Sequence, residues 1–315
     1  MKIVFMGSPD FASGILEAIL NDSSHQVVGV VTVADKAAGR GMKIQKSSVK
    51  ICAEKYNLPI LQPEKLRDEQ FISQLKSLQA DIFVVVAFRM LPEVVWNIPP
   101  KGTINLHASI LPQYRGAAPI NWAIINGETQ TGVTTFFINE KIDEGNMILS
   151  KELYILPEDN AGILHDKLLH IGKFVVLSTL QQIENGTCEE QKQVELSNLK
   201  SAPKLLKENC RIDWNLPTEQ IYNFIRGLSP YPAAFSKYTN SDKEKMIMKI
   251  FSCKKEITIH DISPGIIQTD NKNYLKVACK DGYIFVEEIQ LLGKKRLFIH
   301  DFLLGNKGFN GILLH

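Results

Sequence analysis

The sequence predicts an α/β fold in which a Rossmann-like domain with a mostly parallel sheet precedes a smaller, OB-like β-barrel domain. In the first half of the chain, short apolar runs alternate with stretches of helical periodicity, which is the pattern of βαβ units. In the second half, short strand-like runs follow one another with turn residues between them. A chain of 315 residues is long enough to bury a core in each of two domains.

Five runs of the first half have the composition of strands buried on both faces, because they are short, β-branched and apolar. They cover residues 2–6, 26–33, 81–88, 103–107 and 132–138. Helical patterns at 11–21, 68–79 and 161–185 complete the βαβ alternation. After the first strand, Gly7 and Gly14 stand too far apart for a GxGxxG fingerprint, so a bound dinucleotide is not expected.

The second half follows a polar segment that we interpret as a linker. One helical stretch at 217–227 leads into short strand-like runs separated by glycine and asparagine turns, a pattern that favours a small barrel. These runs cover residues 245–253, 264–279 and 280–293. The predicted boundaries are 1–186 for the Rossmann-like domain, 187–205 for the linker and 206–315 for the barrel.

The composition excludes several classes of protein. The five cysteines include no CxxC pair and the seven histidines include no HExxH motif, so we expect neither a disulfide framework nor a metal. The chain shows no signal-peptide pattern and no apolar run of about 18 residues, so we expect a cytoplasmic protein without a membrane partner.

Charge is distributed unevenly along the chain. Residues 1–199 carry 18 basic and 22 acidic side chains, whereas residues 200–315 carry 18 basic and 12 acidic ones. A basic second half suggests a polyanionic partner, although the excess is modest. The loop 36–50 contains five basic residues and no acidic one, and it is either a solvated surface loop or a phosphate-facing one. Its basic residues are Lys36, Arg40, Lys43, Lys46 and Lys50.

Three polar residues are placed to converge at strand ends. Asn105 and His107 alternate along one predicted strand, so their side chains leave on the same face. Asp143 lies in an IDEGN turn after another strand. An amide that stabilises an oxyanion, an imidazole that moves a proton and a carboxylate that orients it suit acyl transfer. The residues alone also allow a purely structural Asn-x-His pair.

The run NLHASILPQYRGAAP that begins at Asn105 resembles the signature Asn-Leu/Val-His-x-Ser-Leu-Leu-Pro-x-x-Arg-Gly of 10-formyltetrahydrofolate-dependent formyltransferases. The turn at Asp143 resembles their Asp-x-Gly turn. Collinear stretches extend the resemblance over nearly the whole chain: FMGSPDFA at 5–12, AGRG at 38–41, LKENCRIDWNLPTEQIYNFIRGLSPYPAA at 206–234 and GKKRLFIHDFLLG at 293–305. The later stretches resemble in particular the members that act on initiator methionyl-tRNA.

This resemblance implies transfer of a formyl group from 10-formyltetrahydrofolate, a consumed donor, to the α-amine of methionine on initiator methionyl-tRNA, for translation initiation. It places Asn105, His107 and Asp143 in the catalytic positions. It associates four residues with the folate, namely Ser109, Ile110, Leu111 and Pro112. It implies tRNA contacts by Lys36, Arg40 and Lys43. We expect a monomer.

Two segments depart from the family pattern. After the strand at 81–87 the family usually has Ala-Tyr-Gly-x-Ile-Leu-Pro, whereas this chain has AFRMLP and is one residue shorter. Pterin contacts by residues 88–91 are therefore not carried over. In the basic loop, a Pro-Asp-Arg-Pro-Ala-Gly-Arg-Gly type of run is replaced by VADKAAGRG, and the loss of both prolines predicts a more mobile loop in the free protein.

Four other functions stay open from the sequence. A nucleotide-sugar N-formyltransferase would share the catalytic residues and the donor but would not need the basic loop. A formyltetrahydrofolate hydrolase domain would use water as the acceptor and usually precedes a much longer chain. A glycinamide ribonucleotide formyltransferase has no use for residues 206–315, and an RNA-binding protein with an inactive enzyme domain would not need Asn105, His107 and Asp143 intact.

Overall fold

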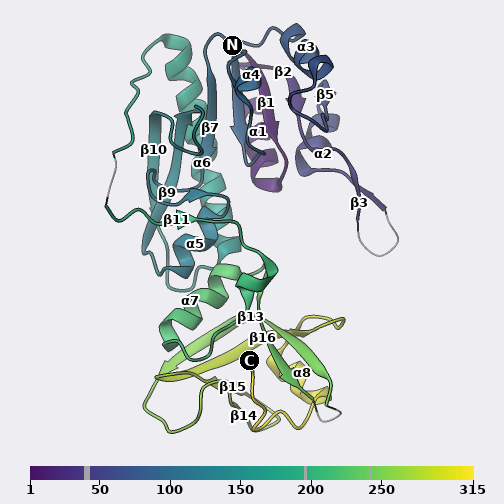
Figure 1. Cartoon of the computed structure of the whole chain (residues 1–315), viewed down its shortest axis with the longest axis vertical. Coiled ribbons are helices and arrows are strands. Elements are labelled where there is room, and N and C mark those ends of the chain that lie inside the picture. The colour runs from purple at the N-terminus through teal and green to yellow at the C-terminus, as the bar shows by residue number, and fades with distance from the viewer. Residues whose placement is uncertain (39–42, 195–196, 241–242) are drawn as a thin grey trace. The chain divides into compact units, whose positions relative to one another are not determined.

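The computed structural model describes residues 1–38, 43–194, 197–240 and 243–315. It divides into two compact units (Figure 1). The first unit comprises Met1–Gly116, Thr131–Leu153 and His165–Ser201, and the second comprises Ala117–Gln130, Tyr154–Leu164 and Ala202–His315. Two internal segments therefore pack with the C-terminal part of the chain. The domain limits 1–186, 187–205 and 206–315 stay a prediction.

The first unit is built on a seven-stranded sheet with the order β10-β9-β7-β6-β1-β2-β5. Neighbouring strands among β7, β6, β1, β2 and β5 run parallel, whereas β9 is antiparallel to β7. The predicted Rossmann-like sheet is thereby confirmed. The strands are β1 (Lys2–Gly7), β2 (Gln26–Val31), β5 (Ile60–Leu61), β6 (Ile82–Val86), β7 (Thr103–His107), β9 (Gln130–Phe137) and β10 (Met147–Tyr154).

Helices cover both faces of this sheet, as an apolar parallel sheet requires. On one face, α1 packs against α6, where Gly14 lies so close to Leu169 that an added Cβ would be 2.9 Å from its Cδ2. On the other face, Val4 of β1 and Phe83 of β6 share a buried cluster with Phe71 of α3. The helices that belong to this unit are α1 (Asp10–Asn21), α2 (Ser48–Lys55), α3 (Glu69–Ser77), α4 (Glu93–Trp96) and α6 (Ala161–Asn185), the last extending into the second unit by its first turn.

The order of the strands places a topological switch point between β1 and β6. The chain runs from β1 outward to β2 and β5, and then returns to the other side of β1 through β6 and β7. Crevices at the carboxyl ends of strands beside such a point are where open α/β sheets bind ligands. Gly7 ends β1 there, and a Cβ at this position would lie 2.8 Å from the carbonyl oxygen of Val86 at the end of β6. Only glycine allows the two strand ends to approach so closely.

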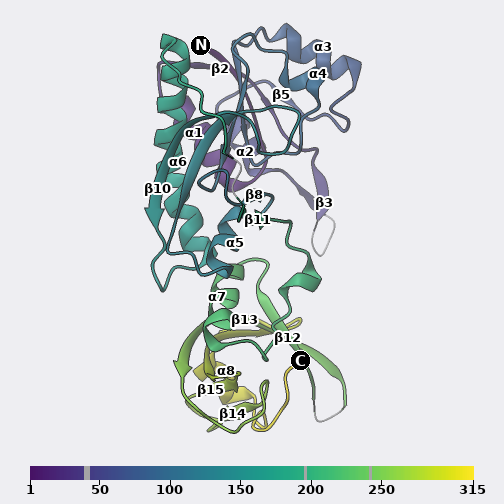
Figure 2. The same ribbon diagram turned by 60° about the vertical axis from the view of Figure 1, so that its left-hand side comes forward.

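Two short two-stranded ladders lie outside this seven-stranded sheet. The first joins β3 (Lys36–Ala38) to β4 (Lys43–Gln45), and Figure 2 shows β3 extending away from the sheet. The second joins β8 (Arg115–Gly116) to β11 (Ser201–Ala202).

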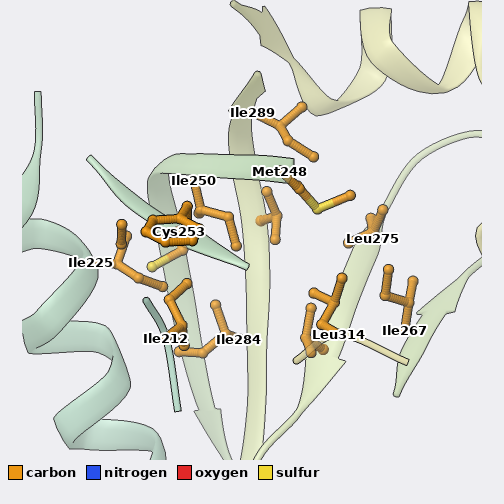
Figure 3. Packing of buried hydrophobic residues seen from close by; sticks show 14 of the residues in the cluster. Ile212, Ile225, Met248, Ile250, Cys253, Ile267, Leu275, Ile284, Ile289 and Leu314 are labelled. Atoms are coloured by element: carbon orange, nitrogen blue, oxygen red, sulfur yellow. The ribbon is translucent and has the colours of Figure 1, made fainter. Parts of the chain in front are cut away.

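The second unit contains a curled antiparallel sheet with the order β12-β13-β16-β15-β14, and β17 pairs with β16. Its strands are β12 (Ala234–Thr239), β13 (Lys245–Ile257), β14 (Ile267–Thr269), β15 (Leu275–Ala278), β16 (Gly282–Leu291) and β17 (Leu297–Phe298). Its helices are α5 (Pro119–Ile125), η1 (Lys207–Cys210), α7 (Thr218–Leu228) and α8 (Ile299–Gly305). The curled sheet encloses a core that includes Met248, Ile250 and Leu275 (Figure 3).

The last residues join the two ends of this curled sheet. His315 and Lys237 of β12 exchange two backbone hydrogen bonds of 2.7 and 2.8 Å. On the other side, Leu314 donates to the carbonyl of Gly265, and Ile267 of β14 donates to the carbonyl of Ile312. The C-terminal segment thus bridges β12 and β14, and the predicted barrel is confirmed in this form.

In the part of the chain that the structure describes, no helix combines the length and the apolar character needed to cross a bilayer.

Candidate active site

Asn105 and His107 lie on β7, whose neighbours are the parallel β6 and the antiparallel β9. In this register Asn105 is paired with Val85 of β6, and His107 is paired with Thr134 of β9. The imidazole is buried, with 6% exposure, whereas Asn105 is partly exposed. Within the described residues, the Asn105 amide forms no hydrogen bond, so its N–H groups are free to bind a ligand.

The backbone of the following loop fixes the orientation of the His107 ring. Nε2 lies 2.8 Å from the carbonyl oxygen of Tyr114. A carbonyl can only accept, so Nε2 carries a hydrogen. Nδ1 on the opposite edge lies 3.8 Å from Oδ2 of Asp143, within the range of an ion pair but beyond that of a hydrogen bond. Nδ1 of His107 therefore faces the carboxylate of Asp143, which we predicted to lie near this ring.

Asp143 is held in a strained turn. Its φ of 55° lies in the left-handed region, which a non-glycine residue adopts only at some cost. Oδ2 accepts the backbone N–H of Gly116 at 2.9 Å, which orients the carboxylate toward the His107 loop. Two residues later, a Cβ on Gly145 would lie 1.6 Å from the carbonyl oxygen of Phe137. The turn thus requires glycine at this position, which explains the Asp-Glu-Gly sequence.

The predicted folate segment is folded against β9. Thr134 Oγ1 donates to the carbonyl of Ser109 at 2.8 Å and accepts the N–H of Leu111 at 3.2 Å. The Ser109 hydroxyl donates to the carbonyl of Gln113 at 2.6 Å. Ser109 and Leu111 are buried, whereas Ile110 and Pro112 are partly exposed. Ile110 also packs against β9, because a Cβ added at Gly132 would lie 2.4 Å from its Cδ1.

The basic loop is partly neutralised. Lys50 Nζ lies 2.5 Å from Oδ2 of Asp35 and donates to Gln62 at 2.8 Å. Lys46 Nζ lies 2.8 Å from a carboxylate oxygen of Glu54. Asp35 and Glu54 lie just outside residues 36–50, which contain no acidic residue. Lys36 is exposed on β3, whereas Arg40 and the Lys43 side chain lie outside the described residues.

The shortened segment after β6 is tied to the loop after β5. Ala87 has a φ of 47°, and the buried Leu91 follows four residues later. Nη1 of Arg89 donates to the carbonyl of Glu64 at 2.9 Å, and Nη2 donates to the carbonyl of Pro63. Burial lowers the pKa of the Arg89 guanidinium. Arg89 is thus engaged by backbone carbonyls, an arrangement that the family pattern did not indicate.

The sequence reasoning missed three residues that hold the site together, namely Thr134, Arg115 and Gln193. Arg115 belongs to the Arg-Gly pair of the signature, and its Nη1 lies 3.1 Å from Oε1 of Glu144. Gln193 lies in the segment interpreted as a linker, and its amide contacts both Arg115 and the Asp143 turn. Only the Arg-Gly pair in the signature could have drawn attention to this cluster.

Residues 1–180 match the family described as formyl transferase, and residues 204–307 match the formyl transferase C-terminal domain. The chain belongs to the formyl transferase family. Among its curated relatives, the methionyl-tRNA formyltransferase of Bacteroides fragilis is 52% identical, over 97% of this chain and 95% of its own length. The methionyl-tRNA formyltransferase of Flavobacterium psychrophilum is 53% identical, over 97% of this chain and 96% of its own.

Solved structures share the fold at low sequence identity. HypX from Aquifex aeolicus in complex with tetrahydrofolic acid gives a TM-score of 0.65 at 19% identity, over 96% of this chain and 47% of that one. WlaRD, a sugar 3N-formyl transferase, gives a TM-score of 0.63 at 22% identity, over 94% of this chain and 99% of that one. These likenesses confirm the fold.

Proposed function

We propose that this chain transfers the formyl group of 10-formyltetrahydrofolate to the α-amine of methionine on initiator methionyl-tRNA. One observation carries the proposal: about half of the residues are identical to those of curated methionyl-tRNA formyltransferases over 97% of this chain, a span that includes both units. The proposal is also supported by the proximity of two of the three residues inferred to be catalytic, since His107 and Asp143 face each other at 3.8 Å.

The reaction forms one C–N bond and breaks another. The methionine amine attacks the formyl carbon, and a tetrahedral intermediate with a negatively charged oxygen results. The bond from that carbon to N10 then breaks, N10 takes up a proton, and the attacking amine loses one. The products are formyl-methionyl-tRNA and tetrahydrofolate, so atoms and charge balance without an oxidant or reductant.

Asn105 stabilises the oxyanion in this account. Its amide has N–H groups without a partner among the described residues and stands on the same face of β7 as His107. A preorganised donor of this kind typically contributes a factor of about 10²–10³ in kcat.

His107 and Asp143 move the proton. Nε2 of His107 is engaged by the Tyr114 carbonyl, so the exchangeable edge of the ring is Nδ1, which faces Asp143. The proton released by the amine passes to this pair and is returned to N10. Asp143 is also kept in place by the N–H of Gly116, which leaves its second carboxylate oxygen for the substrate side.

The folate segment supplies the donor's position. Ser109 and Leu111 are buried and bonded to Thr134, so they fix the backbone immediately after the catalytic strand. Ile110 and Pro112 are the partly exposed members and are assigned to contact with the folate. The formyl donor then lies beside His107, since only two residues separate His107 from Ile110.

The tRNA is assigned to basic surfaces. Lys36 begins β3 and Lys43 begins β4, and Arg40 lies between them in the sequence. The second half of the chain has six more basic than acidic residues (18 against 12). Phosphate contacts by such residues supply affinity and orient the acceptor end.

The second candidate function is formyl transfer to a nucleotide-linked amino sugar, because sugar N-formyltransferases share the fold. Their identity to this chain is 22% or less, against about 50% for the methionyl-tRNA enzymes. The test is to incubate the purified chain with 10-formyltetrahydrofolate and methionine-charged initiator tRNA and to measure formyl-methionine released from the tRNA. No formyl-methionine above a no-enzyme control would overturn the proposal.

A further inference from the structure

Gln193 is the centre of a hydrogen-bonded cluster behind the catalytic turn. Nε2 donates to the carbonyl of Asp143 at 2.8 Å and to the carbonyl of Gly145 at 2.9 Å. Oε1 accepts from Nε of Arg115 at 3.0 Å and from Nη2 at 2.7 Å. The amide therefore uses both of its donors and both acceptor positions on protein groups. The side chain is partly buried, whereas both of its neighbours in the sequence are exposed.

The hydrogen bond from Gln193 acts on Asp143, whose carboxylate must be held in position for the proposed proton transfer. Asp143 is held at a φ of 55°, and such a conformation persists only when surrounding contacts impose it. The carboxylate is held from one side by the N–H of Gly116, and the backbone is held from the other by Gln193. At Gly145 an added Cβ would lie 1.6 Å from the Phe137 carbonyl oxygen, so the turn packs tightly against that residue.

The same side chain joins the turn to the signature loop. Arg115 precedes Gly116, the residue that donates to the Asp143 carboxylate. Arg115 is also paired with Glu144, which lies between the two residues whose carbonyls Gln193 binds. The amide thus fixes the donor loop and the acceptor turn relative to each other. An amide suits this position, because it offers two N–H donors on one side and an acceptor oxygen on the other.

We infer that Gln193 is a positioning residue for catalysis, which sets the Asp143 carboxylate against His107 and contacts no substrate. The inference rests on the proposed function, since it assigns Asp143 a role in formyl transfer. It extends the active site to a segment that the sequence presented only as a linker.

The substitution that tests this is Gln193→Glu. Glutamate keeps the acceptor for Arg115 but replaces two N–H donors by an oxygen that faces two carbonyl oxygens. We expect kcat to fall roughly 10–100-fold, the scale of a displacement of about 1 Å in a catalytic group. The KM values for folate and for the acceptor should stay within about threefold. The matched control is Gln191→Glu, which makes the same change at an exposed residue two positions earlier and should leave kcat unchanged.

A double substitution separates positioning from general stability. If Gln193 acts through Asp143, then Gln193→Glu should cost less than about threefold in an enzyme that already carries Asp143→Asn. Single-turnover formyl transfer should be measured for the four combinations, with the acceptor that the wild-type enzyme uses, and with melting temperatures recorded alongside. An equal loss in both backgrounds, or a Gln193→Glu enzyme with wild-type kcat, would overturn the inference. A wild-type enzyme inactive toward charged tRNA but active toward another acceptor would overturn the proposed function and leave this comparison intact.

Discussion

Nδ1 of His107 faces Oδ2 of Asp143 across 3.8 Å, while Nε2 of the same ring is bonded to the Tyr114 carbonyl at 2.8 Å. The two ring nitrogens of His107 therefore have different partners. The Nε2 edge anchors the ring to the backbone, and the Nδ1 edge faces the carboxylate. This arrangement is the geometric basis of the proton transfer that we propose for this pair.

Substitution of each catalytic residue should lower turnover without unfolding the protein. For Asp143→Asn, His107→Asn and Asn105→Ala we expect kcat to fall by about 10²–10³-fold or more, as for other acid–base and oxyanion groups. Steady-state formyl transfer measures kcat, and binding of the folate should survive in all three. Near-normal turnover in any one variant would remove the role assigned to that residue.

Gly145→Ala should destabilise the protein through the Asp143 turn. Its Cβ would lie 1.6 Å from the Phe137 carbonyl oxygen, so the backbone has to move. We expect a loss of roughly 3 kcal/mol or more in the free energy of unfolding, measured by denaturant titration. The control is Gly305→Ala, where no atom lies within 4 Å of the added Cβ and the change should stay within about 0.5 kcal/mol. Equal stability of the two variants would contradict this account of the turn.

Asp281 should make the stability of the barrel unit depend on pH. Its carboxylate accepts the N–H and the hydroxyl of Thr218 at the start of α7, both at 2.7 Å, and these bonds lower the pKa of Asp281. Because the folded pKa is lowered, the contribution to stability is fully present above the ordinary value of 3.8 and is lost as pH falls through the folded pKa.

The matching substitution is Asp281→Ala. It should cost about 1 kcal/mol at neutral pH, as for loss of a capping carboxylate, and should flatten the fall in stability below pH ~4. Thermal unfolding between pH ~2 and 7 measures both effects. Asp261→Ala, at an exposed carboxylate, provides the comparison. If both variants follow the same pH curve, the Thr218 contact has no energetic role.

The basic loop should act through salt-sensitive phosphate contacts. Replacing Arg40 and Lys43 by alanine should weaken tRNA use and lower the log–log salt slope by up to about one unit per lost contact. Lys36→Ala should act in the same direction. Lys55→Ala is the control, because Lys55 pairs with Glu17 on another part of the first unit. A double variant that formylates charged tRNA like the wild type at every salt concentration would exclude this loop from tRNA binding.

Sequence patterns predicted the elements that depend on local chemistry. The apolar runs form β1, β2, β6, β7 and β9, since strands buried on both faces need such residues. Asn105 and His107 were predicted from a short signature, and Asp143 was predicted from a separate turn that resembles the Asp-x-Gly turn of the family. Nδ1 of His107 and Oδ2 of Asp143 lie 3.8 Å apart, so two of the three residues are close together.

Long-range contacts made by ordinary polar residues were not predictable. Gln193 lies 50 residues from Asp143 in sequence, inside a polar segment with no periodicity. The Tyr114 group that binds His107 is a backbone carbonyl, which has no signature in a side-chain pattern. Asp35 lies one residue before the basic window, so its pairing with Lys50 changes the charge of a loop that contains no acid.

The packing of α5 against α7 could not be predicted from the sequence either. Within the second unit, Asn121 of α5 donates to the carbonyl of Gly227 of α7 at 2.7 Å. A Cβ on Gly227 would lie 2.7 Å from Cγ1 of Ile125, so the two helices approach closely through this glycine. Residues 117–130 therefore join a unit whose largest segment begins only at Ala202, which no local pattern indicates.

The acceptor of the formyl group can be identified by comparing three acceptors in parallel assays. The purified enzyme should be offered 10-formyltetrahydrofolate with three acceptors in parallel: methionine-charged initiator tRNA, a nucleotide-linked amino sugar and water alone. We predict formyl transfer to the charged tRNA with a kcat/KM at least about 10³-fold above that for the amino sugar, a difference of roughly 4 kcal/mol, with little hydrolysis of the donor. A higher kcat/KM for the amino sugar, or donor consumption that does not depend on the tRNA, would contradict the account.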